Sequence, residues 1–288
     1  MYDNNINTTP KVALFHDMSC FGRCALSVII PIISALKIQP VMFPTALLST
    51  HTGGFTDFTF LDLTEEIKKI IAHYEQLKII PDCIYSGFLG SEEQIKIISD
   101  YIIKQKERGA YIFVDPVMGD NGRLYSSYTD QMKKGMINIA KSADIITPNI
   151  TEAFFLLDMD YQKPPYGKDF IDGMLLKLFE LFEYNIEKII ITSAVFNNGE
   201  YGVAYGENLT SQEIKTGYIF TQHHEKDYPG SGDIFSSILC GQLLNGVCLT
   251  DAIKSAVEFL NNVIEYTIKS GTPEREGLIF ERFLGELT

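Results

Sequence analysis

The amino-acid sequence predicts an α/β fold: a doubly wound, mostly parallel central sheet with helices on both faces. Short runs of continuous apolar residues, typical of strands buried on both faces, alternate with longer runs of helical periodicity. Such alternation, with right-handed crossovers, produces a layered sandwich around one sheet. Two strand-like runs, Glu200–Ala204 and Thr216–His223, follow each other without a helix between them and therefore indicate an antiparallel edge.

Six apolar runs are predicted to form the parallel strands. They are Lys11–His16, Pro40–Thr45, Cys83–Tyr85, Tyr111–Val114, Ile145–Thr147 and Lys188–Thr192. Between and after them lie segments whose apolar residues recur on one face of a helix. These segments are Thr64–Tyr74, Ser91–Ile102, Thr129–Ala140, Lys168–Phe182, Ile234–Leu244 and Leu249–Ile268.

Two local signals refine the expected helices. The run Ser91-Glu92-Glu93-Gln94 has the spacing of a capping box, so a helix is expected to begin there. Pro31 interrupts the segment Cys24–Leu36. Because proline lacks a backbone N–H, we expect that helix to kink or to start later.

The chain length is that of one large α/β domain. Of its 288 residues, we assign 11–288 to a single domain and 1–10 to a flexible N-terminal tail. The tail is polar and has none of the features of a signal peptide. The longest apolar stretch, Val28–Ile33, is far shorter than a membrane span. We therefore expect a cytoplasmic protein.

The charge and the cysteines narrow the possible partners. A net charge of −13 argues against a nucleic-acid or anionic-membrane surface, because both require a positive field. Small anions remain possible where backbone donors and a metal meet them. The five cysteines show no metal-binding spacing, which fits reduced thiols in the cytoplasm.

The segment Pro229-Gly230-Ser231-Gly232-Asp233 stands directly before a predicted helix. Two glycines let successive N–H groups point into one concavity, and the helix N-terminus adds its positive dipole end. The segment is therefore an anion hole in which Asp233 is placed to take a proton from an attacking hydroxyl. The alternative is an ordinary helix N-cap formed by Asp233.

Two further strand ends carry groups suited to Mg²⁺. Asp115 follows one strand, and Asn149 with Glu152 follows another and opens a helix. In a parallel sheet these ends meet at one edge, where ligands bind. Carboxylate and amide oxygens hold Mg²⁺ directly or through water. The alternatives are turns, or a first-turn acid that faces the helix dipole.

Several motifs in this order resemble the ribokinase-like superfamily, and within it the pyridoxal/pyridoxamine kinases, over roughly residues 11–270. They are Ser49-Thr50-His51-Thr52-Gly53, Ser86-Gly87-Phe88, Asp115-Pro116-Val117-Met118-Gly119-Asp120, Ala143–Asn149 with Glu152, Ile191-Thr192-Ser193, and Gly230-Ser231-Gly232-Asp233. The resemblance implies phosphorylation of the 5′-hydroxymethyl group of pyridoxal, pyridoxamine or pyridoxine. It also implies ATP as co-substrate, Mg²⁺, room for a monovalent cation, and a homodimer.

The resemblance also implies a role for each matched residue. Asp233 is then the general base, and Gly230, Ser231 and Gly232 form the anion hole. The expected nucleotide and metal residues are Asp115, Asn149, Glu152, Thr192 and Ser193, of which Asp115, Asn149 and Glu152 serve Mg²⁺, partly through water. The expected ring-binding residues are Asp17, Ser19, His51, Thr52 and Phe88, with Phe88 stacking on the ring. His223–Pro229 is the candidate lid.

Two other functions stay open. Asp17 resembles the hydroxymethylpyrimidine kinases of thiamine synthesis, although these usually place cysteine where this chain has Asp233. A non-catalytic binding protein of the same fold is the second alternative, and its mark would be loss of the base or of the anion-hole glycines. A sugar kinase is disfavoured because Gly22–Pro40 leaves no room for the separate lid sheet of those enzymes.

Overall fold

The computed structural model of the chain describes residues 9–197, 199–210, 213–224 and 226–288. Its centre is a nine-stranded sheet in the order β11-β10-β9-β8-β5-β4-β1-β2-β3. The strands are β1 (Lys11–Ser19), β2 (Gln39–Leu48), β3 (Phe60–Asp62), β4 (Cys83–Ser86), β5 (Tyr111–Val114), β8 (Ile145–Ile146), β9 (Lys188–Val195), β10 (Tyr201–Thr210) and β11 (Glu213–Thr221). The predicted fold class is confirmed.

The sheet is parallel in its middle and antiparallel at both edges. β2, β1, β4, β5, β8 and β9 pair in parallel along the sheet. The antiparallel edge expected near residues 200–223 is formed by β10 and β11, although β11 ends at Thr221 and leaves His223 outside it. At the other edge β3 pairs antiparallel with β2 and was missed, because three residues carry no periodicity.

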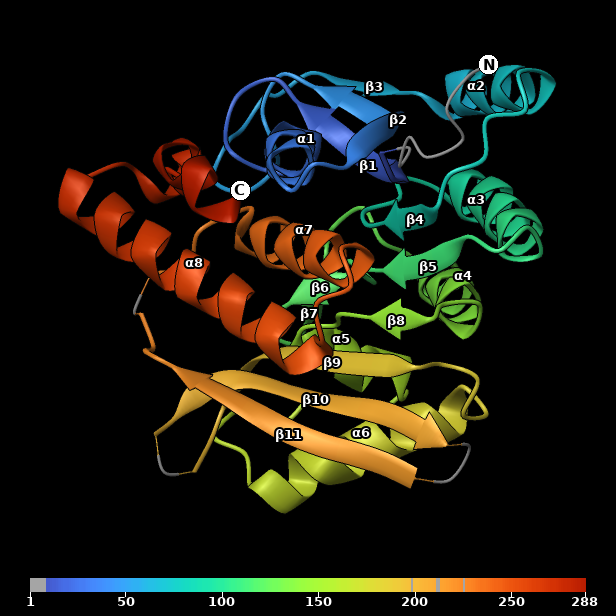
Figure 1. Ribbon diagram of the computed structural model, residues 1–288. Helices are drawn as coiled ribbons and strands as arrows, with labels where there is room; N and C mark the ends of the chain where they lie inside the picture. The colour runs from blue at the N-terminus through green and yellow to red at the C-terminus, as the bar shows by residue number, and fades with distance from the viewer. Residues whose placement is uncertain (1–8, 198, 211–212, 225) are drawn as a thin grey trace, which may run out of the picture.

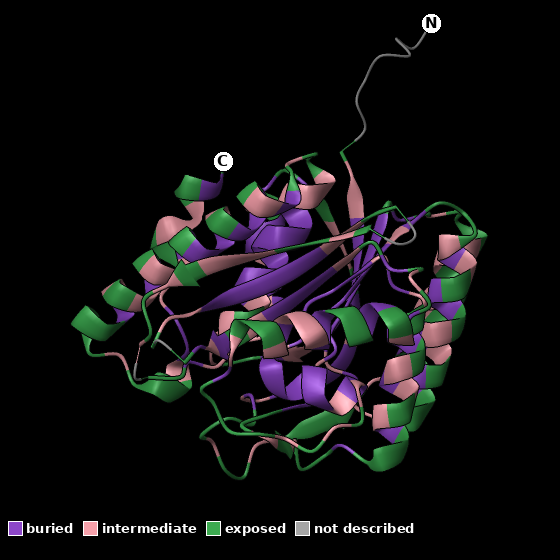
Figure 2. Cartoon of the chain, turned by 90° about the horizontal axis from the view of Figure 1, so that it is seen from below, coloured by how far each residue is buried: buried purple, intermediate pink, exposed green. Residues whose placement is uncertain are grey.

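The helices form one layer on each side of the sheet (Figure 1). They are α1 (Leu26–Ala35), α2 (Thr64–Gln76), α3 (Glu92–Lys106), α4 (Asp130–Lys141), α5 (Ile150–Leu156), α6 (Lys168–Leu181), α7 (Ser231–Leu244) and α8 (Leu249–Ser270). Side chains of α1, α7 and α8 bury one face of the sheet, and those of α2 to α6 bury the other. Figure 2 shows the resulting pattern, with buried strands between helices whose outer sides are exposed.

Short polar signals set several helix starts. Ser91, Thr129 and Asn149 each accept a hydrogen bond from the backbone N–H three residues later, at the starts of α3, α4 and α5. The later start expected for the first helix is wrong, since α1 contains Pro31. Five buried side chains anchor it, and at about 1.5–3 kcal/mol each they outweigh the cost of about 3 kcal/mol for an interior proline.

Both described ends of the chain contact the rest of the structure. Residues 1–8 of the expected tail lie outside the described residues, and the carbonyl of Pro10 already accepts a hydrogen bond from Gln39 N at 2.8 Å. After α8 come two 3-10 turns, Glu274–Glu276 and Glu281–Leu287, and the second packs against α1 and α8. Within the described part of the chain, no helix combines the length and apolarity that crossing a membrane requires.

Because six neighbouring strands run in parallel, their carboxyl ends open at the same edge of the sheet. The loops after β1, β2, β4, β5, β8 and β9 meet there, and α7 begins at that edge. The loop after β5 also holds a small hairpin, β6 (Gly119–Asp120) with β7 (Arg123–Leu124), which the sequence pattern did not predict. This edge is where the expected site residues lie.

Candidate active site

The turn that leads into α7 depends on a glycine. Gly230 is the N-cap of the helix, with φ at +83°, in the left-handed region. A Cβ there would lie 2.1 Å from the carbonyl oxygen of Arg23. No other residue type therefore fits between the helix start and the loop after β1. Ser231 N–H makes a long bond of 3.3 Å to the Tyr228 carbonyl, so one of the three expected anion-hole amides has a partner.

Asp233 lies in the first turn of α7, and its carboxylate points across to the loop after β1. Its Oδ2 accepts hydrogen bonds from Ala25 N at 2.8 Å and from Cys24 Sγ at 3.5 Å. The N-cap interpretation is therefore wrong, because Gly230 occupies that position. Burial raises the pKa of Asp233, and the donors Ala25 and Cys24 oppose the rise. Such an acid is a stronger base than a solvated aspartate.

Two further acids lie beside Asp233. Burial, and next the charge of Asp233, raise the pKa of Asp17 to about 6, although Ser19 Oγ donates to Asp17 Oδ2 at 3.0 Å. Burial and Asp233 likewise raise the pKa of Asp115 to about 7. The structure thus brings the acids from β1, β5 and α7 together. A cluster of buried like charges is costly unless a cation or a proton offsets it.

Asp115 has a hydroxyl partner that the sequence reading missed. Ser236 Oγ donates to Asp115 Oδ2 at 3.0 Å and lies 3.1 Å from Thr147 Oγ1. Ser236 follows Asp233 by three positions, so the two share one face of α7. That spacing is the only sequence signal that could have found it. The contact of Ala25 N–H with Asp233 leaves no signal, since every residue type but proline offers that donor.

Asn149 and Glu152 form a reciprocal capping box at the start of α5. Asn149 Oδ1 accepts from Glu152 N at 2.9 Å, and Glu152 Oε2 accepts from Asn149 N at 2.8 Å. Met118 N–H donates to the other carboxylate oxygen at 3.0 Å, and Asn149 Nδ2 donates to Gly119 O at 2.9 Å. Burial, then the charge of Asp115, raises the pKa of Glu152 well above its usual range. The cap alternative accounts for these contacts.

This arrangement decides how a cation could fit. In the part of the chain that the structure describes, no three His, Cys, Asp or Glu side chains are grouped as a metal cage. The polar atoms of Asn149 and Glu152 already hold backbone groups, so water is the route by which these two could reach an ion. The negative field of the clustered acids suits Mg²⁺, which keeps several of its waters.

Thr192 and Ser193, near the end of β9, lie beside the α5 cap. Thr192 N–H donates to the Pro148 carbonyl at 2.9 Å, and Thr192 bridges Asn149 in parallel. Ser193 is exposed with φ at +59°, an uncommon conformation for a residue with a side chain. Such outliers concentrate at functional sites. The two residues therefore present polar groups at the same edge as Asn149.

Both ring nitrogens of His51 make hydrogen bonds to backbone groups. Its Nδ1 accepts from Gly53 N at 3.1 Å, so Nε2 carries the proton that goes to the Arg275 carbonyl at 2.8 Å. A Cβ on Gly22 would lie 2.4 Å from the ring. Burial lowers the pKa of His51, which stays neutral. The histidine therefore joins the loop after β2 to the C-terminal turn.

Thr52 and Phe88, two other residues expected to bind the ring, are more exposed to solvent than His51. Thr52 is exposed, and Phe88 is half-buried with its ring centroid 6.2 Å from that of Tyr128. A cleft of about 520 Å³ opens beside His51. It is lined by Gly53, Gly54, Asp227, Pro229 and 273–275. The candidate lid His223–Pro229 thus borders the cleft, although residue 225 lies outside the described residues.

The C-terminal turn was missed as part of this edge. Arg23 N–H donates to the Glu276 carbonyl at 3.1 Å, and Arg23 Nε lies 2.6 Å from Glu281 Oε1. Gly277 packs so closely that a Cβ would lie 2.8 Å from the Arg23 carbonyl oxygen. The loop that carries Ala25 N–H to Asp233 is therefore held between α7 and the C-terminal turn.

Comparisons with known proteins show which family the chain belongs to. The family model for phosphomethylpyrimidine kinase matches residues 30–276. A pyridoxal kinase of Pasteurella multocida is 27% identical over 77% of both chains. A structure from Bacteroides thetaiotaomicron, provisionally named phosphomethylpyrimidine kinase, is 36% identical with a TM-score of 0.91 over 99% of this chain and 96% of its own. A second form of that protein contains pyridoxal.

A pyridoxal kinase from Lactobacillus plantarum is also similar, at 26% identity and a TM-score of 0.87 over 96% of both chains. The fold and the family match both lead to one group. The chain belongs to the phosphomethylpyrimidine kinase family of ribokinase-like proteins, the group that includes the pyridoxal kinases, and it is a phosphotransferase that acts on an alcohol group.

Proposed function

We propose that the protein phosphorylates the 5′-hydroxymethyl group of pyridoxal, pyridoxamine or pyridoxine, with ATP as donor and Mg²⁺ as cofactor. The observation that carries the proposal is the half-buried carboxylate of Asp233 in the first turn of α7, which accepts hydrogen bonds from Ala25 N at 2.8 Å and Cys24 Sγ at 3.5 Å. Hydroxymethylpyrimidine kinases usually have cysteine at the matching position. Pyridoxal kinases among the relatives, and pyridoxal in a protein 36% identical to this one, support the choice of substrate.

The reaction follows from the groups around α7. Asp233 accepts the proton of the substrate's hydroxymethyl group, and the oxygen of that hydroxymethyl group forms a bond to the γ-phosphorus of ATP. The bond from that phosphorus to the bridging oxygen of ADP breaks, and ADP leaves. The amides of the Gly230–Gly232 turn and the dipole of α7 stabilise the charge of the transferring group. Proximity and charge stabilisation supply most of the acceleration in such transfers.

The nucleotide side is assigned to the residues near β5, β8 and β9. Thr192 and Ser193 contact the phosphates of ATP. Asp115 would hold Mg²⁺, with Asn149 and Glu152 acting through water, and the bound ion would supply positive charge against the phosphates. Full activity in excess EDTA would contradict this assignment.

The ring side is assigned to the loops after β1, β2 and β4. Asp17 and Ser19 meet polar groups of the ring, Phe88 stacks on its face, and Thr52 borders its edge. His51 reaches the ring only indirectly, because both of its nitrogens already hold backbone groups.

Hydroxymethylpyrimidine is the second candidate substrate, and Asp17 is the observation that favours it. This acid stands at the end of β1 with its pKa raised to about 6, so it offers either a charge or a proton to a ring nitrogen. The family model that matches the chain also bears the name of the pyrimidine kinase.

An ADP-release assay with ATP and Mg²⁺ separates the candidates. Pyridoxal, pyridoxamine, pyridoxine and hydroxymethylpyrimidine are presented separately. We expect turnover with the three pyridines. Faster turnover of hydroxymethylpyrimidine would overturn the proposal in favour of the second candidate. No ADP release with any of the four compounds would favour a non-catalytic binding protein.

We also propose a cytoplasmic homodimer. The support is the edge formed by β2 and β3, where four apolar side chains face solvent: Met42 (43% exposed), Leu47 (40%), Phe60 (49%) and Leu61 (56%). Sedimentation at low micromolar concentration tests this point. A monomer that Leu61→Lys leaves unchanged would contradict it.

A further inference from the structure

Gln94, in the first turn of α3, is fully buried, with 0% of its surface exposed. Its backbone N–H donates to Ser91 Oγ at 3.2 Å, which is one half of the predicted capping box. The other half is absent, because the Gln94 side chain does not return to Ser91 and instead joins other segments. A buried amide that leaves its own helix cap requires another explanation.

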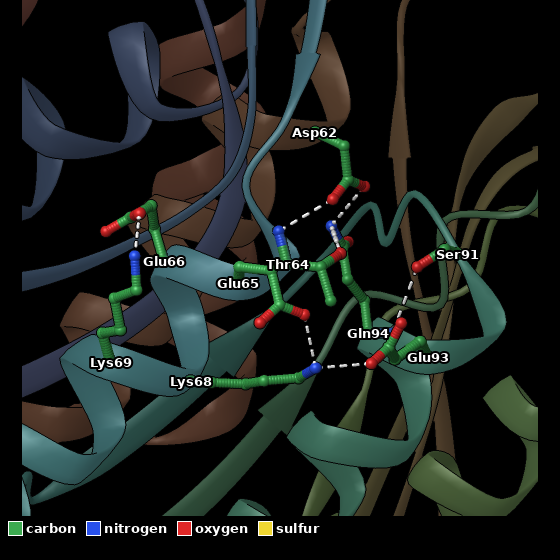
Figure 3. A network of polar contacts seen from close by, with 9 residues as sticks. All are labelled: Asp62, Thr64, Glu65, Glu66, Lys68, Lys69, Ser91, Glu93 and Gln94. Atoms are coloured by element: carbon green, nitrogen blue, oxygen red, sulfur yellow. Dashed lines mark hydrogen bonds and ion pairs between the residues drawn. The ribbon is translucent and has the colours of Figure 1, made fainter.

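Every polar atom of the Gln94 side chain has a partner. Oε1 accepts from Gly90 N at 2.8 Å, and Nε2 donates to the Thr45 carbonyl at 2.8 Å. Nε2 also lies 3.1 Å from Asp62 Oδ2 and 3.0 Å from Thr64 Oγ1 (Figure 3). These partners fix the orientation of the amide, because a carbonyl and a carboxylate accept only from the nitrogen.

The partners come from segments that are far apart in the sequence. Thr45 lies on β2, Asp62 ends β3, Thr64 begins α2, and Gly90 ends the loop after β4. Thr45 Oγ1 in turn donates to the Phe88 carbonyl at 3.4 Å. The loop that carries Phe88 is therefore tied to β2 at two points, and Gln94 makes the shorter bond.

We propose that Gln94 is a positioning residue that fixes the Phe88 loop for binding of the ring of the alcohol substrate. The inference rests on the proposed function, in which Phe88 stacks on that ring. Gln94 itself touches no substrate. A glutamine suits the position because one end of its amide must accept from Gly90 while the other donates to β2. An apolar side chain would leave the part-buried N–H of Gly90 and the buried carbonyl of Thr45 without the partners that Gln94 supplies.

Gln94→Met keeps the length of the side chain and removes its amide. Gln105→Met is the matched control, since Gln105 is a second buried glutamine of α3, 1% exposed, near the opposite end of the helix. Loss of the bond to Gly90 is expected to raise the KM for the B6 substrate about tenfold in Gln94→Met, the effect of one or two hydrogen bonds. The KM for ATP and kcat should follow the control. Equal changes in both KM values, or none, would contradict the inference.

Amide hydrogen exchange supplies a readout that needs no substrate. In the free protein, the amides of residues 87–91 are expected to exchange faster in Gln94→Met than in Gln105→Met. Lys68→Ala is a second control, because Lys68 joins the same helices α2 and α3 through Glu65 and Glu93 on the surface (Figure 3). Unchanged exchange in Gln94→Met would overturn the inference.

A milder variant serves if Gln94→Met does not fold. Thr45→Val removes the bond to the Phe88 carbonyl and leaves the amide of Gln94 in place. It is expected to shift the same KM in the same direction by a smaller factor, and no shift would count against the inference. If the wild-type protein turns over none of the three pyridines, the proposed function fails. The exchange experiment still decides whether Gln94 holds the loop.

Discussion

Asp17, Asp115, Glu152 and Asp233 are acids that lie near one another at one edge of the sheet, where Asp115 and Glu152 are buried and the other two are half-buried. Burial raises the pKa of each, and in three of them a neighbouring acid raises it further. A protein stabilised only for folding would not keep such a cluster, because buried charges without a counter-ion are costly. The cluster fits the proposed site, in which a cation and a proton would offset these charges.

Asp17→Asn is expected to stabilise the free protein at pH 8. The pKa of Asp17 in the folded state is about 6, above the ordinary 3.8, so folding favours the protonated form. Its contribution to stability is present below about pH 4 and is lost as the pH rises through about 6. Removing the charge should raise the Tm at pH 8 by about 2–4 °C for each kcal/mol recovered.

The same melts give the control. The gain from Asp17→Asn should vanish near pH 4, where wild-type Asp17 is protonated. Asp158→Asn should give no gain at pH 8, because a hydrogen bond from Lys133 lowers the pKa of that exposed acid. A Tm of Asp17→Asn at or below that of the wild type at pH 8 would contradict the expectation.

At the proposed site, the sequence offers signals only for residues whose type suits the chemistry. Asp233 and Gly230 could be found because a glycine-rich turn before a helix has few other uses. Cys24 could not, since it acts through a contact made by the fold, and Ser236 left only the signal of its spacing from Asp233. The roles of Asn149 and Glu152 stayed open, because a capping box and a metal site require the same residue types.

At the scale of elements, the helices and strands that the sequence predicted correctly are those that are long and have continuous or periodic apolar residues. The six buried strands and most helices were found, because continuous or periodic apolar character is a strong signal over those lengths. β3, β6 and β7 were missed, since two or three residues show no period. The expectation that the first helix starts after Pro31 failed, because the free energy gained by packing α1 against the sheet exceeds the cost of the hydrogen bond that the proline cannot make.

Two glycines at the start of α7 form a matched pair. Gly230→Ala places a methyl group 2.1 Å from the Arg23 carbonyl at a φ of +83°. It is expected to destabilise the protein by about 2–5 kcal/mol through strain and overpacking. A Cβ on Gly232 meets nothing within 4 Å, so Gly232→Ala should stabilise the helix by about 0.5–1 kcal/mol. Thermal melts compare the two variants. Equal stability of Gly230→Ala and Gly232→Ala would show that the loop after β1 does not pack closely against the start of α7.

At the scale of the whole molecule, one sheet separates two hydrophobic cores. The chain crosses from one face to the other several times, and its C-terminal turns return Leu278 and Phe280 to the core beside α7. Neither core is complete without the shared sheet. This shared sheet is the physical reason to expect that residues 11–288 unfold as a single domain.

One unfolding transition is expected from this architecture. Far-UV circular dichroism reports the helices, and the near-UV signal of the 15 tyrosines reports tertiary packing on both faces. The two thermal curves should coincide, because loss of either core exposes the sheet that supports the other. Two separated midpoints would contradict the single-domain assignment.

The most direct test of the central claim is phosphoryl transfer by Asp233→Asn. The amide keeps the shape of the side chain but takes no proton, so turnover of pyridoxal should fall by about 10²–10⁴-fold. Binding of ADP and the far-UV spectrum should match those of the wild-type protein. Loss of turnover with nucleotide binding intact is the predicted result. Turnover close to that of the wild-type protein would show that Asp233 is not the base.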